Sequence, residues 1–182
     1  MNHVTLELRR VDPAERTVVG VCAPYDETTF LTADPDGERI RRGAFRRSIQ
    51  HHRGAIPLLR NHEQDRKLGR SRKFTETDEG LIGEFVVNNG GPGDALLAEL
   101  TDGYLDAMSV GFQPVRVERG AGGVREIVEA RLVEVSMVAL PAYQGAQMLA
   151  VRTASVDDVL APFLNRPQVN LDPIPPLWPR SV

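Results

Sequence analysis

Short segments in which apolar and polar residues alternate run through most of the chain. This period of two is typical of strands with one buried face. It predicts strands over residues 4–8, 17–23, 56–62, 68–74, 81–87, 107–118 and 124–140. We expect the first two to form a hairpin, a loop over residues 24–38 and a polar turn over residues 63–65. The pattern describes a chain built mainly of short strands.

Two segments show the spacing of short amphipathic helices instead. Phe45 and Ile49 lie one turn apart within residues 38–49, which gives that segment an apolar stripe and an arginine-rich face. Such a face usually contacts only water, and an acidic partner is the alternative. Residues 95–100 carry three leucines that would dock a helix onto the sheet. For that helix, Asp94 is the expected N-cap and Gly103 the expected stop.

Many strands and few helices predict a mostly β fold with some α (α+β). The expected architecture is a single β-barrel-like antiparallel domain surrounded by short helices. A length of 182 residues suits one domain with a core and a tail. Prolines become frequent after residue 153, so only a short helix over 156–160 is expected there. We therefore place the domain at residues 1–152 and a largely extended, proline-rich tail at residues 153–182.

Composition narrows the classes of function. The net charge is −3 and the calculated pI is near 5.8, so no basic field points to nucleic acid. No apolar run reaches membrane-spanning length, and the N-terminal residues lack a signal peptide's apolar core. We expect a soluble protein that stays inside the cell. Cys22, the single cysteine, excludes an internal disulfide and a multi-cysteine metal site, and its apolar neighbours predict a buried structural thiol.

Ser109 is the first candidate for chemistry. Alternation places it on a strand face with only the small residues Ala107 and Gly111, where a substrate backbone has room to approach. The alternative is a small residue that simply packs against its neighbour. The opposite face carries the bulky side chains of Met108, Val110 and Phe112.

His62 and Glu134 complete a candidate constellation. His62 ends an apolar strand, and Glu134 interrupts the apolar run at residues 132–138. An ionised carboxylate in a buried strand is costly without a partner, and an imidazole is a suitable one. A serine, a histidine and an acid are the nucleophile, general base and orienting group of acyl transfer.

Each of these residues also has a simpler interpretation. His62 is an ordinary surface histidine if no acid reaches it, and Glu134 is an edge-strand charge if it faces water. His51 and His52 are alternative bases, although they follow an amphipathic helix and should be exposed. A zinc site made from the three histidines lacks regular ligand spacing, and no metal or cofactor is predicted.

Four motifs in order resemble the prohead (capsid-maturation) serine proteases of tailed bacteriophages. They read ERI and GAF within residues 38–45, LLRNH at 58–62, MSVGF at 108–112, and LVEVSMV followed by PA within 132–142. The resemblance covers roughly residues 15–152. It implies the fold of the herpesvirus assemblins, with Ser109 as nucleophile, His62 as base and Glu134 as the third member of the triad.

The resemblance also implies a function. Such an enzyme is an endopeptidase that trims scaffold or the N-terminal region of the major capsid protein, and also itself, inside proheads in the host cytoplasm. Those proteins would be its partners, with self-association into a homo-oligomer and no nucleic acid or membrane. The alternative is a non-catalytic assembly or scaffold protein that keeps the fold. A small-molecule esterase lacks support, because no Gly-x-Ser-x-Gly elbow precedes a helix.

Overall fold

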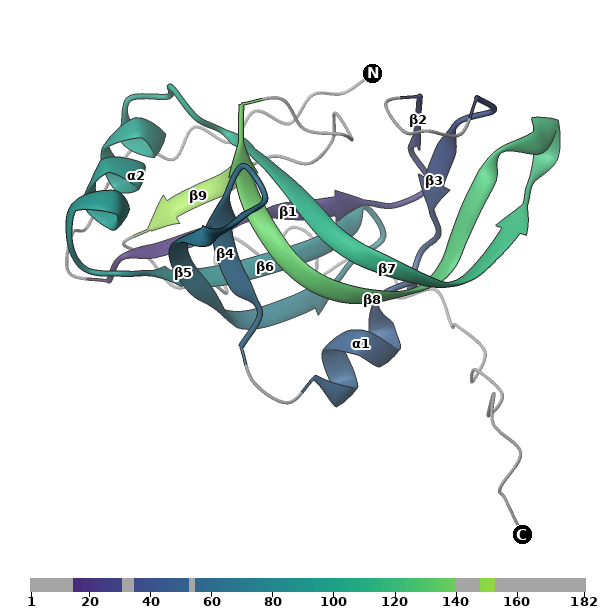
Figure 1. Cartoon of the computed structure of the whole chain (residues 1–182), viewed down its shortest axis with the longest axis horizontal. Helices are drawn as coiled ribbons and strands as arrows, with labels where there is room; N and C mark the ends of the chain where they lie inside the picture. The colour runs from purple at the N-terminus through teal and green to yellow at the C-terminus, as the bar shows by residue number, and fades with distance from the viewer. Residues whose placement is uncertain (1–14, 31–34, 53–54, 140–147, 153–182) are drawn as a thin grey trace, which may run out of the picture.

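The computed structural model describes residues 15–30, 35–52, 55–139 and 148–152. Within these ranges, one nine-stranded sheet and two short α-helices account for most of the chain (Figure 1). The strands are β1 (Thr17–Pro24), β2 (Thr28–Thr29), β3 (Glu38–Ile40), β4 (Pro57–Arg60), β5 (Glu63–Glu76), β6 (Gly80–Val87), β7 (Ala107–Arg119), β8 (Arg125–Val138) and β9 (Met148–Arg152). The helices are α1 (Arg46–His51) and α2 (Gly91–Thr101), and a 3₁₀ turn covers Ala121–Gly123.

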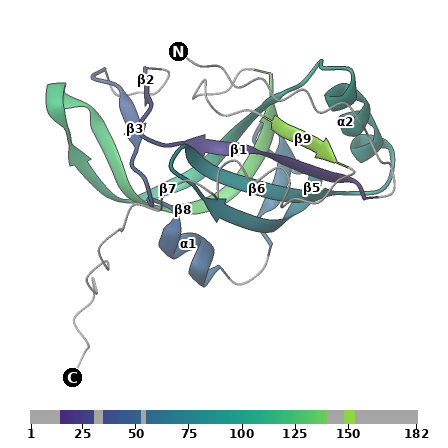
Figure 2. The ribbon, with the colours of Figure 1, turned by 180° about the vertical axis from the view of Figure 1, so that it is seen from behind.

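Strand β8 is the branch point of the sheet, because it pairs with the three strands β3, β4 and β7. The strand order is β2-β3-β8-β4-β5-β6-β1-β9, and β7 pairs with the other edge of β8. Strands β3 and β4 run parallel to β8, and the remaining pairs are antiparallel. The sheet curls so that β1 contacts β7 across the interior, as Figures 1 and 2 show from two sides. The fold is therefore mostly β with few helices, as predicted, in the form of a curled half-barrel.

The concave side of the sheet encloses the hydrophobic core. Met108 and Val110 on β7 point into it, and Phe112 packs against its margin, as the alternation predicts. Phe112 also meets Phe45 edge to face, with ring centroids 5.7 Å apart. Fully burying one large apolar side chain contributes about 1.5–3 kcal/mol to stability. The core thus fixes which face of β7 turns inward and leaves Ser109 on the other face.

The prediction of one helix over residues 38–49 is wrong at its start. Glu38–Ile40 forms β3, in which Glu38 and Ile40 are buried on either side of the half-buried Arg39. The strand lies parallel to β8, and its sheet partner overrides the local helical pattern. Gly43, with a φ of +81°, then turns the chain before α1 begins at Arg46.

The arginine-rich segment makes its contacts within the chain. Arg39 and Arg41 both bind the Glu126 carboxylate, and Arg47 lies 3.0 Å from Glu129. Burial opposes ionisation of Glu126, but hydrogen bonds from the two guanidinium groups outweigh it and lower the pKa of the carboxyl. The acidic partners of these three arginines lie on β8 of the same chain. The arginine-rich face therefore neither contacts only water nor requires an external acidic partner.

Helix α2 docks on the sheet through its leucines, as predicted, but begins earlier than expected. Gly90 is its N-cap residue, and Asp94 lies in the first turn, where its carboxylate is 2.7 Å from Arg16. The leucines at positions 96, 97 and 100 are buried. They therefore offer no exposed apolar surface for self-association.

The predicted strand at residues 4–8 and the predicted helix at 156–160 lie outside the described residues. The domain boundary at residue 152 likewise stays a prediction. The pairing of β9 with β1 is consistent with this boundary, because Thr17 pairs with Arg152 and the sheet therefore continues to residue 152.

A chain that ends at Arg152 should fold and melt within a few degrees of the full chain, because it keeps the β1–β9 ladder. A chain that ends at residue 147 is the matched control. It lacks β9, exposes the edge of β1 and should aggregate or melt much lower. Thermal melting with light scattering measures both. Aggregation of the Arg152 chain would show instead that the tail completes the core.

Candidate active site

Three strands bring distant parts of the chain together on the outer face of the sheet. Ser136 on β8 is the register partner of Ser109 on β7 and of Leu59 on β4. Glu134, two residues earlier on β8, is the partner of Gly111. Directly opposed residues on neighbouring strands point to the same side of a sheet. Ser109 and Glu134 therefore share one face, and both are largely buried, with 7% and 8% of their surface exposed.

A β-bulge at Val133 interrupts β8 just before Glu134. The pairing of β7 with β8 skips Val133, which is therefore an extra residue on β8. Val135 and Met137 lie in the core, so regular alternation from them places Glu134 on the outer face. The same alternation would turn Val133 inward and Leu132 outward, yet Leu132 is buried and Val133 is 40% exposed. The bulge therefore lets Leu132 enter the core while the carboxylate two residues later stays on the outer face.

His62 stands at the end of β4 in a tight turn. Arg60 and Glu63 are register partners, so Asn61 and His62 alone connect β4 to β5. Both have positive φ, 50° and 63°, as a two-residue type I′ hairpin turn requires. The turn predicted at residues 63–65 is therefore wrong, because those residues already belong to β5. Histidine at a position that favours glycine indicates that the side chain is needed there.

The side chains of His62 and Glu134 form the expected contact. The Nδ1 atom of His62 lies 2.7 Å from Oε1 of Glu134. With a carboxylate as acceptor, Nδ1 carries the proton, so in the neutral ring Nε2 is left with a free lone pair. The His62 side chain is 47% exposed and thus accessible. The structure thus contains a His–acid pair, with its acid on the strand that pairs with the strand of Ser109.

Gly111 has a role that differs from the predicted one. A Cβ atom added at this position would lie 2.1 Å from Oε1 of Glu134. The space over Gly111 is therefore occupied by the Glu134 carboxylate and is not free for a substrate backbone. The missing side chain on β7 is what lets the acid lie flat against the sheet beside His62.

Gly111→Ala should lower activity by about 100-fold, because the added methyl group displaces the carboxylate that orients His62. It should also lower the melting temperature by several degrees through overpacking. The control is Gly91→Ala, since a Cβ there meets nothing within 4 Å. Assays of the expected peptidase activity and thermal melts of both variants measure the effect. Unchanged activity in Gly111→Ala would show that Glu134 has room to move without loss.

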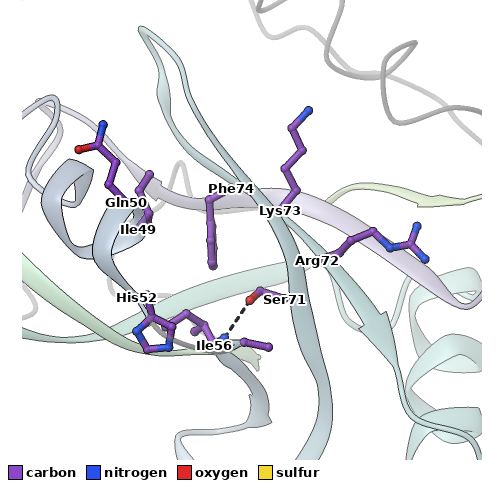
Figure 3. Close-up of a pocket in the computed structure, with 9 residues that line it drawn as sticks. Ile49, Gln50, His52, Ile56, Ser71, Arg72, Lys73 and Phe74 are labelled. Atoms are coloured by element: carbon purple, nitrogen blue, oxygen red, sulfur yellow. Dashed lines mark hydrogen bonds between the residues drawn. The ribbon is translucent and has the colours of Figure 1, made fainter.

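The alternative residues lie elsewhere. His51 bonds the carbonyl of Arg47 at the end of α1, and His52 lines a hollow of about 520 Å³ between α1 and β5. Figure 3 shows His52 in this hollow with Phe74 and Ser71. Its lining includes no member of the His62 site. Among the described residues, no group of three His, Cys, Asp or Glu side chains is placed to hold a metal ion.

Cys22 is buried, as predicted, and burial raises the pKa of its thiol far above the ordinary value. A thiol in this state is a poor nucleophile. It belongs to the core and not to the site.

Ser136 is the member of the site that the sequence reasoning missed. Its Oγ donates to Oε2 of Glu134 at 2.7 Å and accepts the backbone N–H of His62 at 3.0 Å. The available signal was its spacing, because residues i and i+2 of a strand share a face. Ser136 follows Glu134 by two positions, but the register that sets it opposite Ser109 is not visible in local sequence.

Comparison with known proteins gives this arrangement a context. The family model described as caudovirus prohead serine protease matches residues 4–161. The chain belongs to this family. The prohead protease of Enterobacteria phage HK97 is 27% identical over an alignment of 138 residues that covers 72% of this chain. The chain spans only 60% of the length of that relative.

Two solved structures share the fold of this family member. The protease of Kaposi's sarcoma-associated herpesvirus matches with a TM-score of 0.51 and 14% identity, over 80% of this chain and 68% of its own. The capsid assembly protease of bacteriophage T4 matches with a TM-score of 0.50 and 15% identity, over 67% of this chain and 80% of its own. These likenesses agree with the predicted assemblin-like fold. In the described part of the chain, no helix has the length and apolar character of a membrane span.

Proposed function

We propose that this prohead protease family member is a serine endopeptidase, with Ser109 as nucleophile, His62 as general base and Glu134 as the acid that orients His62. The observation that carries the proposal is the 2.7 Å contact between Nδ1 of His62 and Oε1 of Glu134, on the strand that pairs with the strand of Ser109. Three segments far apart in sequence supply the three groups. The family match independently supports the serine protease class.

The reaction follows from the roles of the three side chains. Nε2 of His62 takes the proton of the Ser109 hydroxyl while Oγ attacks the scissile carbonyl carbon. The protonated imidazole, stabilised by Glu134, then gives its proton to the leaving amine as the C–N bond breaks. Water next attacks the acyl–enzyme ester, with His62 again accepting a proton, and hydrolysis frees Ser109. Glu134 stays ionised throughout and holds the ring in one tautomer.

The proposed substrates are scaffold protein and the N-terminal region of the major capsid protein, and self-cleavage accompanies their processing. The proposed place of action is the interior of assembling proheads in the host cytoplasm. The names of the two phage relatives, a prohead protease and a capsid assembly protease, support this choice. Co-expression of the full chain with the major capsid protein of its own phage tests it. Mass spectrometry should find a shortened capsid protein with a new N-terminus, and an intact capsid protein would contradict the proposal.

We further propose that the enzyme acts as a weak oligomer that forms when it is concentrated inside the particle. An endopeptidase that is active at low concentration would destroy shell subunits before assembly, whereas confinement favours association by mass action. Specific activity should fall on dilution from micromolar to nanomolar protein, in step with dissociation seen by sedimentation. Flat specific activity from a protein that is monomeric throughout would contradict association and leave substrate presentation as the control.

A further inference from the structure

The hydroxyl of Ser136 lies at the centre of the polar contacts around Glu134. It donates to Oε2 of the carboxylate, while the other oxygen, Oε1, faces Nδ1 of His62. The same Oγ accepts the backbone N–H of His62 at 3.0 Å. One buried side chain therefore touches both the acid and the backbone of the base.

Ser136 is not placed to act as a nucleophile itself. Its surface is 0% exposed, so no substrate carbonyl reaches it, and its hydroxyl proton is directed at Glu134. Ser109, its register partner on β7, keeps 7% of its surface exposed and, within the described part of the chain, makes no such bond to the carboxylate. The two serines are neighbours with different environments.

We propose that Ser136 is a positioning residue that locks the His62–Glu134 pair in its working geometry. The proposal rests on the proposed function. By donating to Oε2, the Ser136 hydroxyl fixes the rotation of the carboxylate and keeps Oε1 on Nδ1. By accepting the His62 N–H, it also holds a residue whose backbone has a φ of 63°. Residues that lock an orienting acid in this way determine how well the base is aligned.

Loss of the hydroxyl has a specific consequence. In Ser136→Ala, Oε2 loses its donor and the His62 N–H loses its acceptor, and the burial of Ser136 and Glu134 leaves the carboxylate oxygen without a partner. The turn stays attached through the Asn61 N–H, which donates to the carbonyl of Met137 at 3.1 Å, and through the strand pairing of β4, but the His62 backbone is no longer held. Carboxylate and imidazole then sample several orientations. This loss of alignment between the carboxylate and the imidazole should slow the chemical step by about 10–100-fold.

The experiment measures labelling of the full chain by a fluorophosphonate, which reacts with an activated serine as fluoride leaves. Ser136→Ala should label at Ser109 with the same half-saturating probe concentration as wild type, but with a maximal rate about 10–100-fold lower. NMR of the His62 Nδ1 proton supplies a second readout, and its signal should shift or broaden in the variant. A general loss of stability lowers the labelled fraction without changing that signal in the folded molecules.

Ser71→Ala is the matched control. Ser71 is also a strand serine whose Oγ accepts a backbone N–H, from Ile56 at 2.8 Å, and it lies at the hollow between α1 and β5 (Figure 3). It loses the same kind of bond without touching the site, so its labelling rate and the His62 signal should match wild type. Ser136→Cys is the second variant, because a thiol is a weak donor and acceptor of similar shape. It should fold and still label more slowly than wild type.

The outcomes separate this inference from the proposed function. A wild-type rate and an unchanged His62 signal in folded Ser136→Ala or Ser136→Cys would overturn the role of Ser136 while leaving the triad intact. Equal slowing in Ser71→Ala would also overturn it, by showing a general packing effect. Failure of wild type to label, or equal labelling of Ser109→Ala, would overturn the proposed function itself.

Discussion

Ser109→Ala should abolish processing of the co-expressed capsid protein, with a loss of roughly four to six orders of magnitude in rate. The substitution removes the attacking oxygen and nothing that holds the strand, because the core contacts of β7 come from Met108 and Val110 on the opposite face. The folded state should therefore persist. Capsid cleavage followed by mass spectrometry gives the activity, and a thermal melt confirms the fold.

Ser71→Ala is a suitable control for the nucleophile. Its Oγ accepts the backbone N–H of Ile56 at 2.8 Å, at the hollow whose lining includes no member of the His62 site. It should process the capsid protein at the wild-type rate. If Ser109→Ala also cleaves at that rate, the assignment of Ser109 is wrong, and the His62–Glu134 pair serves another purpose.

His62→Ala should be as inactive as Ser109→Ala, because it removes the proposed base that takes the proton of the proposed nucleophile. Alanine also tolerates a φ of 63° poorly, so the variant loses both a base and a favourable turn residue. His62→Asn separates these effects. Asparagine accepts the left-handed conformation without being a base, and this variant should fold like wild type and still be inactive.

Glu134→Gln should retain a trace of activity, about 10⁴-fold below wild type. The amide keeps the size of the side chain, but it no longer enforces the tautomer that leaves Nε2 free. Steady-state peptidase assays on the purified full chain measure the ratio. Undiminished activity would remove Glu134 from the site. Asp65 and Asp106, both exposed, would then be the acids to test.

The elements that sequence could predict are those fixed by local periodicity. Alternation identified most strands and placed Ser109 on the face opposite Met108 and Val110. The free-energy cost of burying a charge singled out Glu134, because a carboxylate inside an apolar run needs a partner. The identity of that partner came from the order of the motifs and not from spacing alone.

The remaining features depend on register between segments far apart in sequence. The bulge at Val133 decides that Leu132 enters the core beside the outward-facing Glu134, and it exists only as a mismatch between β7 and β8. The turn at Asn61 and His62 was misplaced because residues 63–65 look polar and turn-like, yet pairing with β4 draws them into β5. Ser136 and Gly111 acquire their roles from the same cross-strand pairing.

The most direct test of the catalytic assignment is a peptide map of the full chain after reaction with a fluorophosphonate. We expect one phosphonyl group per chain, on the peptide that contains Ser109, and no labelling in His62→Asn. Labelling on another serine, such as Ser136, or labelling of Ser109 that persists at the wild-type rate in His62→Asn, would contradict the assignment.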